Sequence, residues 1–163
     1  MEGLRFAYPR PFLTIAAFAQ PAAPTFVPAG CDVPRLHKSS GYQFVPPGPD
    51  LARHDYEAYI SSFEHLQQTF SMNTRWPQAN LTMADAMKDV ESEKARFDAR
   101  RSFTYAVLTP DGAKEIGCAY VSPSRKQGYD AVVRVWVIKA QFDADFEAVL
   151  IPEVKQWLGS AAW

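Results

Sequence analysis

The sequence predicts an α+β domain in which two helices precede an antiparallel meander of three strands and one more helix follows it. Two observations predict the helices. Apolar residues recur every three to five positions over residues 51–70, and a similar stripe runs over residues 83–97. The third observation is the segment 102–137, where strand-like runs alternate with turn-forming residues.

The amino-acid composition narrows both the class of protein and the kind of partner to expect. With 163 residues and 47% hydrophobic content, the chain can bury one domain core. The 17 Lys and Arg nearly balance the 18 Asp and Glu, without blocks of like charge. We therefore expect neither nucleic acid nor a membrane surface as a partner. The two cysteines, Cys31 and Cys118, lack metal-ligand spacing, so we predict free thiols, no metal and a reducing, cytoplasmic compartment.

The N-terminal segment 1–19 has a weak resemblance to a secretion signal. Arginines precede an apolar stretch at 12–19, which ends in a small-x-small triplet. Pro9, Pro11 and Glu2 are unfavourable in such a signal, and the alternative is a Pro/Ala-rich extension. No apolar run reaches the roughly 18 residues of a membrane-spanning helix.

Proline divides the chain into an arm and a domain. Nine of the 13 prolines lie before Asp50, where they disfavour long helices and central strands. We predict an N-terminal arm over residues 1–40 and a folded domain over 41–163. Gly41–Val45 is the first candidate strand.

The two predicted helices have recognisable starts. Asp50 is a favourable N-cap for a helix over Leu51–Phe70, and residues 72–81 form a loop. Thr82 and Asp85 resemble a capping box that starts the second helix, Thr82–Arg101.

The meander follows these helices. Phe103, Tyr105 and Val107 share one face of its first strand, and a Thr-Pro-Asp-Gly turn leads to Glu115–Val121. Gly117 within that second strand indicates a bulge or a close backbone approach.

The last strand and the helix after it complete the prediction. The strand Asp130–Ile138 is apolar on both faces except at Arg134, so we expect a central strand that is covered on both sides. In the segment 143–158, Pro152 either kinks one helix or starts a separate one.

This layout, with the phrases FTYAVLTPDGAKEIGCAYVSPS and DAVVRVWV, resembles the GNAT N-acetyltransferase superfamily from about Tyr42 onward, in a divergent bacterial branch that is short at its C-terminal end. The resemblance implies a mainly antiparallel mixed sheet, with two helices after the first strand and one after the fourth. Tyr42–Val45 would be that first strand and Asp130–Ile138 the fourth.

The resemblance also implies a place for acetyl-CoA as co-substrate. In the family the backbone of the fourth strand pairs with the pantetheine arm, which here assigns cofactor binding to Val135, Trp136, Val137 and Ile138. The following loop normally carries glycines that let backbone N–H groups approach the diphosphate. Residues 139–146 contain no glycine and offer Asp143 and Asp145 to an anionic ligand, which is unfavourable.

Four residues are candidates for an acceptor site. Trp76 lies in the loop that forms the acceptor wall in the family, although it could equally cap a core. Cys118 and Tyr120 alternate on one strand face, and Arg134 lies on the next strand. If buried, Arg134 needs a partner, which would be either a structural carboxylate or a bound anion.

Acyl transfer to an amine needs a general base, because the attacking nitrogen must be neutral. Glu115 is the nearest carboxylate on a predicted strand, although we expect it to be solvated beside a turn, and Tyr120 is the other candidate catalytic group. The three histidines show no metal spacing.

The sequence is therefore compatible with three functions. The first is an N-acyltransferase that moves an acyl group from acyl-CoA to an amine. The second is a catalytically degenerate module on the same scaffold, which binds a ligand or forms a homodimer through an exposed sheet edge. The third is an NTF2-like cone around a small-ligand pocket.

Overall fold

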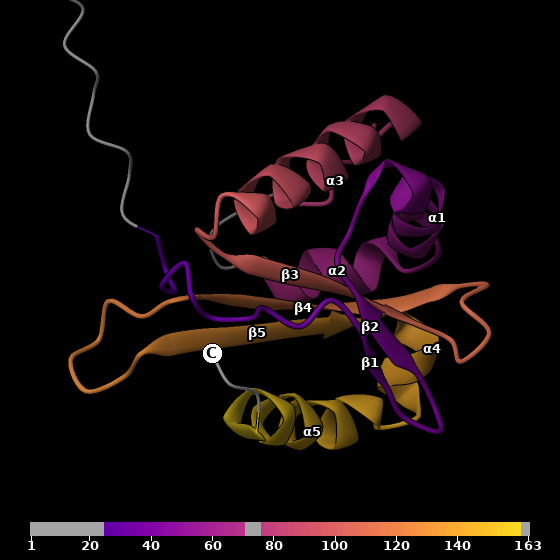
Figure 1. Ribbon diagram of the computed structural model, residues 1–163. Coiled ribbons are helices and arrows are strands. Elements are labelled where there is room, and N and C mark those ends of the chain that lie inside the picture. Colours follow the sequence, from indigo (N-terminus) through magenta and orange to yellow (C-terminus); the bar gives the residue numbers. More distant parts are fainter. Residues whose placement is uncertain (1–24, 71–75, 161–163) are drawn as a thin grey trace, which may run out of the picture.

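The computed structural model of the protein describes residues 25–70 and 76–160, so the signal-like segment 1–19 lies outside the described residues (Figure 1). The strands are β1 (His37–Lys38), β2 (Gln43–Val45), β3 (Phe103–Leu108), β4 (Glu115–Pro123) and β5 (Ala131–Val137). The helices are α1 (Ala52–Ser61), α2 (Phe63–Phe70), α3 (Met83–Asp98), α4 (Lys139–Asp143) and α5 (Phe146–Ser160), and a 3₁₀ turn, Pro49–Leu51, precedes α1.

One antiparallel sheet organises the fold. Its strand order is β1-β2-β3-β4-β5, with each strand hydrogen-bonded to its sequence neighbour. Figure 1 shows α1, α2 and α3 on one face of this sheet and α5 on the other. This arrangement confirms the predicted α+β class and the predicted order of helices and meander.

The position of β5 corrects a prediction. It is the last strand of the sheet, not a central one, and no described strand pairs with its outer edge. The side chains on both faces of β5 are mostly apolar because helices cover the sheet from both sides. Trp136 packs under α1 and α2, whereas Val137 packs toward α5. Arg134 is exposed, so it carries no buried charge and needs no partner.

The first predicted helix, Leu51–Phe70, is broken at Ser62 and forms α1 and α2. The Ser61 hydroxyl donates to the Ala58 carbonyl at 2.8 Å, and the Ser62 hydroxyl accepts the backbone N–H of Lys139 at 2.8 Å. Serine side chains compete in this way with the helical backbone ladder. Because the partner of Ser62 lies 77 residues away, the pattern of α1 and α2 alone could not reveal the break.

The start of α3 agrees with the prediction. The Thr82 hydroxyl accepts the backbone N–H of Asp85, and the Asp85 carboxylate accepts the backbone N–H of Thr82. This capping box fixes the helix start and thereby the direction of its inner face.

In the last segment, α5 continues through Pro152, which agrees with the single-helix alternative.

The described part of the arm packs onto the domain. Val27 and Val33 are buried in the core, and β1 extends the sheet. The Arg100 guanidinium donates to the carbonyl oxygens of Pro28 and Cys31, both at 2.7 Å. These bonds hold residues 25–40 against the end of α3.

Two apolar clusters lie on opposite faces of the sheet. The larger joins Phe44, Tyr105 and Val137 to Leu150 and Trp157 on the α5 side. The smaller is built from Tyr59, Leu66, Cys118 and Trp136, beneath α1 and α2. The smaller cluster borders the candidate site.

Gly117 is required by a close backbone approach, as predicted. A Cβ atom at this position would lie 2.3 Å from the carbonyl oxygen of Trp136 and 3.1 Å from Val137. The register between β3 and β4 also shifts beside it, between Val107 and Leu108.

We therefore expect Gly117→Ala to lower the free energy of unfolding by about 1–3 kcal/mol, because β5 must move to admit the methyl group. Urea denaturation at neutral pH measures this change. Gly30→Ala is the matched control, since no atom lies within 4 Å of its added Cβ, and it should change stability by less than about 0.5 kcal/mol. Equal effects of the two substitutions would contradict the steric explanation.

Candidate functional site

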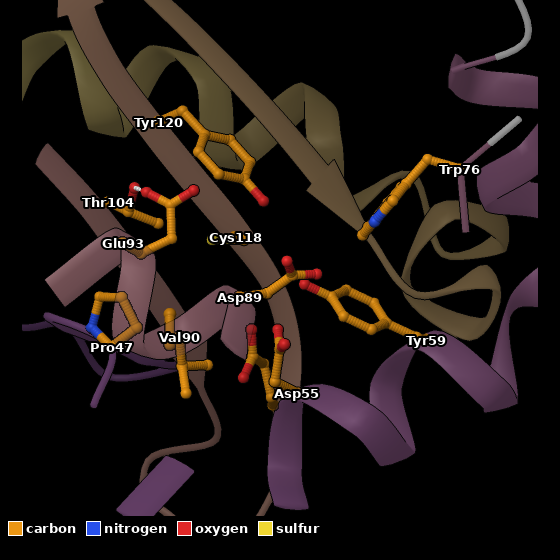
Figure 2. Close-up of a pocket in the computed structure, with 12 residues that line it drawn as sticks. Pro47, Asp55, Tyr59, Trp76, Asp89, Val90, Glu93, Thr104, Cys118 and Tyr120 are labelled. Carbon is orange, nitrogen blue, oxygen red and sulfur yellow. Dashed lines mark hydrogen bonds between the residues drawn. The ribbon is translucent and has the colours of Figure 1, made fainter. Parts of the chain in front are cut away.

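A pocket of about 160 Å³ lies between α1, α3 and the strands β3 and β4 (Figure 2). It is smaller than the sites that hold drug-sized ligands, so it suits one chemical group and not a nucleotide. The lining residues are Pro47, Asp55, Tyr59, Trp76, Asp89, Val90, Glu93, Thr104, Ala106, Glu115, Cys118 and Tyr120.

The lining is strongly acidic. It includes the carboxyl groups of Asp55, Asp89, Glu93 and Glu115, and no lysine or arginine is among the lining residues. Glu93 is compensated, because one of its oxygens accepts the Thr104 hydroxyl and the other pairs with Arg96. The remaining three carboxyl groups form no ion pair among the described residues, and they make this pocket acidic.

Asp55 enters the pocket from the sheet-facing side of α1. It is only 5% exposed, and its Oδ2 atom is buried without a hydrogen-bond partner among the described residues. Burial raises the pKa of Asp55 to about 7; a hydrogen bond from Tyr59 opposes this shift, and the charges of Asp89 and Glu93 add to it. A buried carboxyl group with an unused acceptor atom is costly unless a ligand pairs with it.

Glu115 corrects the expectation of a solvated side chain. It begins β4 directly after the turn, yet it is only 5% exposed because α1 packs over this end of the strand. Burial raises the pKa of Glu115 well above its usual value, and the nearby Asp55 charge raises it further. Glu115 also lines a second cavity, of about 260 Å³, together with Ile138 at the end of β5.

Aromatic rings form the wall opposite the carboxyl groups. The Trp76 ring packs edge-on against Tyr59, with centroids 4.6 Å apart, and against Phe70 at 5.1 Å. The indole N–H of Trp136 donates to the Tyr120 hydroxyl at 3.1 Å. Figure 2 shows the hydroxyls of Tyr59 and Tyr120 directed into the space that Asp89 also faces. Trp76 therefore both caps the smaller core cluster and lines the pocket.

The structure brings some of the predicted site residues together. Trp76, Glu115, Cys118 and Tyr120 all line the acidic pocket. Burial raises the pKa of the Cys118 thiol well above its usual value, so Cys118 is not an activated nucleophile. Arg134 is the cross-strand neighbour of Tyr120 but lies outside this pocket.

Sequence reasoning missed Asp55, Asp89 and Tyr59. A signal was present for Asp55, because it precedes Tyr59 by four residues and so falls on the apolar stripe of its helix. Asp89 is adjacent to the buried Val90 on α3. The convergence of these side chains depends on how α1 and α3 pack on the sheet.

The predicted cofactor residues lie at the end of β5. Trp136 and Val137 are buried, and Val135 and Ile138 are half-buried. The first turn of α4, where the resemblance places the diphosphate loop, uses the backbone donors of Lys139, Gln141 and Phe142 within the protein. Lys139 N–H bonds to Ser62, and the N–H groups of Gln141 and Phe142 bond to the Ile138 carbonyl, both at 2.9 Å. These residues do not fit a diphosphate.

No protein-family profile matches the sequence, and no curated protein matches it. Solved structures do match. RimL, a ribosomal L7/L12 α-N-protein acetyltransferase in complex with coenzyme A, superposes with a TM-score of 0.52 at 13% identity over 63% of this chain and 54% of that chain. The ribosomal-protein-S5-alanine acetyltransferase from Vibrio fischeri gives 0.53 at 14% identity over 67% and 57%.

An apo form of RimL gives a TM-score of 0.53 at 12% identity over 80% of this chain and 70% of that chain. At such identities the likeness establishes the fold, and the chain has the GNAT fold, as predicted. The NTF2-like alternative is therefore wrong. The chain spans little more than half the length of the first two acetyltransferases.

The described residues contain neither a membrane-spanning helix nor a group of side chains placed for a metal ion. None of the described helices has the length and apolar character needed to cross a bilayer. In residues 25–70 and 76–160, no group of three or more His, Cys, Asp or Glu side chains is placed to hold a metal ion.

The raised pKa of Asp55 predicts a pH-dependent stability. The folded protein keeps the Asp55 proton to about pH 7, whereas the unfolded chain loses it near 3.8. Stability should therefore fall as pH rises between these values, by roughly 2–3 kcal/mol from pH 5 to pH 8. Asp55→Asn should reduce this decrease and be the more stable form at pH 8, while the decrease that remains belongs to Glu115, whose pKa is also raised by burial.

Urea denaturation at pH 5 and pH 8 measures the effect. Glu57→Gln is the control, because Glu57 is exposed on the same helix. A wild-type stability that is unchanged or rises between these pH values would contradict the assignment.

Proposed function

We propose that this chain binds a protonated amine in the acidic pocket of a GNAT scaffold, and that this amine is an acceptor for acyl transfer where an acyl donor is also bound. The single observation that carries the proposal is the buried, unpartnered Oδ2 of Asp55, in a pocket that is also lined by Asp89, which has a hydrogen bond from Trp76, and by Glu115.

The chemistry of the lining favours an ammonium group over other ligands. An anion would be repelled by Asp55, Asp89 and Glu115, and a neutral apolar group would leave the Asp55 oxygen without a partner. An ammonium group supplies three donors and a positive charge. The hydroxyl oxygens of Tyr59 and Tyr120, which point into the same space, can accept hydrogen bonds from it.

Acyl transfer is supported by two observations. The fold is shared with acetyltransferases, one of them in complex with coenzyme A. Glu115 lines both the acidic pocket and the cavity next to Ile138, so a carboxyl group stands between the amine and the end of β5. With its raised pKa, Glu115 is suited to accept a proton from the acceptor amine. Tyr120 remains the second candidate catalytic group, placed in the same pocket.

The non-catalytic alternative is supported by the first turn of α4. The N–H groups of Lys139, Gln141 and Phe142 are bonded to Ser62 and Ile138, and the Lys139 side chain pairs with Asp143, which disfavours a diphosphate there. In that case the scaffold binds the amine without an acetyl-CoA co-substrate. The unpaired outer edge of β5 would then be the place for homodimer contacts.

Isothermal titration with alaninamide tests amine binding, since this probe carries an α-amine and no carboxylate. We expect binding at pH 7 that is lost with N-acetylalaninamide, because acetylation removes the charge. Asp55→Asn should weaken binding by about tenfold or more, the value of a charge-assisted hydrogen bond. Glu64→Gln is the control and should bind normally, because Glu64 is exposed on α2 and lines neither cavity. Equal heats for the free and acetylated probes would overturn the proposal.

Titration with acetyl-CoA, with coenzyme A in parallel, decides between the enzyme and the binding module. Saturable heat, followed by transfer of the acetyl group to alaninamide, would establish the acyltransferase. If protein that binds alaninamide gives no heat with millimolar acetyl-CoA, the chain is an amine-binding module and not an acyltransferase.

A further inference from the structure

The outer edge of β5 presents a row of backbone groups that no strand covers in the part of the chain that the structure describes (Figure 1). At one end of the strand, the Ile138 N–H donates to the Ile116 carbonyl at 3.0 Å. At the other end, the Asp130 carbonyl accepts the Ser124 N–H at 3.1 Å. Hydrogen-bonded residues alternate along an antiparallel ladder, so the even-numbered residues of β5 turn their backbone groups toward β4. The odd-numbered residues turn theirs outward.

This edge lacks the usual protection against pairing with another chain. Natural edge strands are commonly kept apart by lysines, prolines or β-bulges. The seven residues of β5, AVVRVWV, include neither lysine nor proline, and its register with β4 is continuous. Arg134 is its one charged residue. A strand so rich in valine pairs readily unless a charge opposes the pairing.

Two hollows border the first half of this edge, one on each face of the sheet. The basic pocket, of about 570 Å³, is lined by Arg134 and two cations of the β4–β5 loop, with no carboxyl group among its lining residues. Arg134 shares a strand face with Trp136, which packs under α1 and α2. The apolar pocket, of about 440 Å³, lies on the α5 face and is lined by Ala131, Leu158 and residues 26–28, among others. Asp130 also lines it.

We propose that a second copy of this chain covers the edge, with the two β5 strands antiparallel about a two-fold axis at Val132. In this register Val132 lies opposite its own copy and Ala131 lies opposite Val133. Asp130 lies opposite Arg134. The outward-facing residues then form the hydrogen-bonded pairs, and every contact is made twice because the interface is symmetric.

The charges select this register. An axis at Arg134 would place two guanidinium groups directly opposite each other, and like charges in that position are destabilising. An axis at Val133 would place Arg134 opposite Val132 and would leave Asp130 opposite Trp136. No register other than the axis at Val132 places Asp130 opposite Arg134.

The same register directs matching groups toward the two hollows. Asp130 and Arg134 are exposed, and neither forms an ion pair among the described residues. Side chains that lie directly opposite in an antiparallel pair share a face, with Cβ atoms about 5 Å apart. The second copy's Asp130 would therefore meet Arg134 beside the basic pocket. On the other face, the second copy's Val133 would lie against Ala131 beside the apolar pocket.

This interface is independent of the proposed amine site. The acidic pocket shares no lining residue with either hollow at the β5 edge. A dimer would form whether the chain is an acyltransferase or an amine-binding module, and substitutions at the edge should leave alaninamide binding unchanged.

Sedimentation velocity at low salt, over about 1–100 µM chain, tests the pairing, and we expect wild type to be mainly dimeric at the upper end of this range. Asp130→Arg and Arg134→Asp should each weaken the dimer by about thirtyfold, because each turns two attractions into two repulsions. An equal mixture of the two variants should regain the dimer, since each variant then supplies the charge that the other lacks. Arg53→Asp is the control, because Arg53 is exposed on α1 and lines neither hollow.

A cysteine scan of β5 tests the register separately. Val132→Cys should give a disulfide-linked dimer on mild oxidation, because opposite residues of a non-hydrogen-bonded pair have Cα atoms about 4.5 Å apart, within disulfide range. Val135→Cys is the control in the same background of Cys31 and Cys118. The two copies of position 135 would lie six residues apart along the ladder, or about 20 Å, and should not be linked.

The outcomes are distinct from those of the amine titration. A wild-type chain that stays monomeric at about 100 µM would overturn the second copy as the occupant of the edge and leave it to a different chain. Charge-reversal variants that dimerise as wild type does, or equal linkage at positions 132 and 135, would overturn the proposed pairing. None of these results alters the test with alaninamide.

Discussion

The packing of α1 against β4 is the constraint on which the rest of the site depends. It buries the carboxyl groups of Asp55 and Glu115 at one end of the sheet, where neither keeps full contact with water. The apolar contacts of Ala58, Tyr59 and Leu66 with Cys118 and Trp136 offset this cost. The same contacts set the position of the aromatic wall, so the charge and the shape of the pocket have one origin.

Buried carboxyl groups without partners are unfavourable for folding, and strongly shifted pKa values are most common where a protein uses the group. In this chain the two groups with raised pKa values, Asp55 and Glu115, both line one pocket. The same pocket contains the unused acceptor atom of Asp55 and is also lined by tyrosine and tryptophan side chains. A purely structural origin would be expected to leave each group paired, as Glu93 is with Arg96 and Thr104.

The bond between Ser62 and Lys139 links the break between α1 and α2 to the first turn of α4. It ends α1, starts α2 and occupies the first backbone donor of α4. The break in the first predicted helix and the use of a backbone donor at the start of α4 therefore involve the same hydrogen bond.

The sequence by itself determined the element order, the α3 capping box and the need for Gly117, because these follow from side-chain periodicity and from short-range hydrogen bonds and sterics. It also indicated Trp76, Cys118 and Tyr120 through strand alternation and loop position. Only the tertiary structure decided that Glu115 is buried, that Asp55 joins it and that β5 lies at the sheet edge. Burial and charge convergence depend on contacts between α1, α3 and β4, which are distant in sequence, and local patterns carry no information about such contacts.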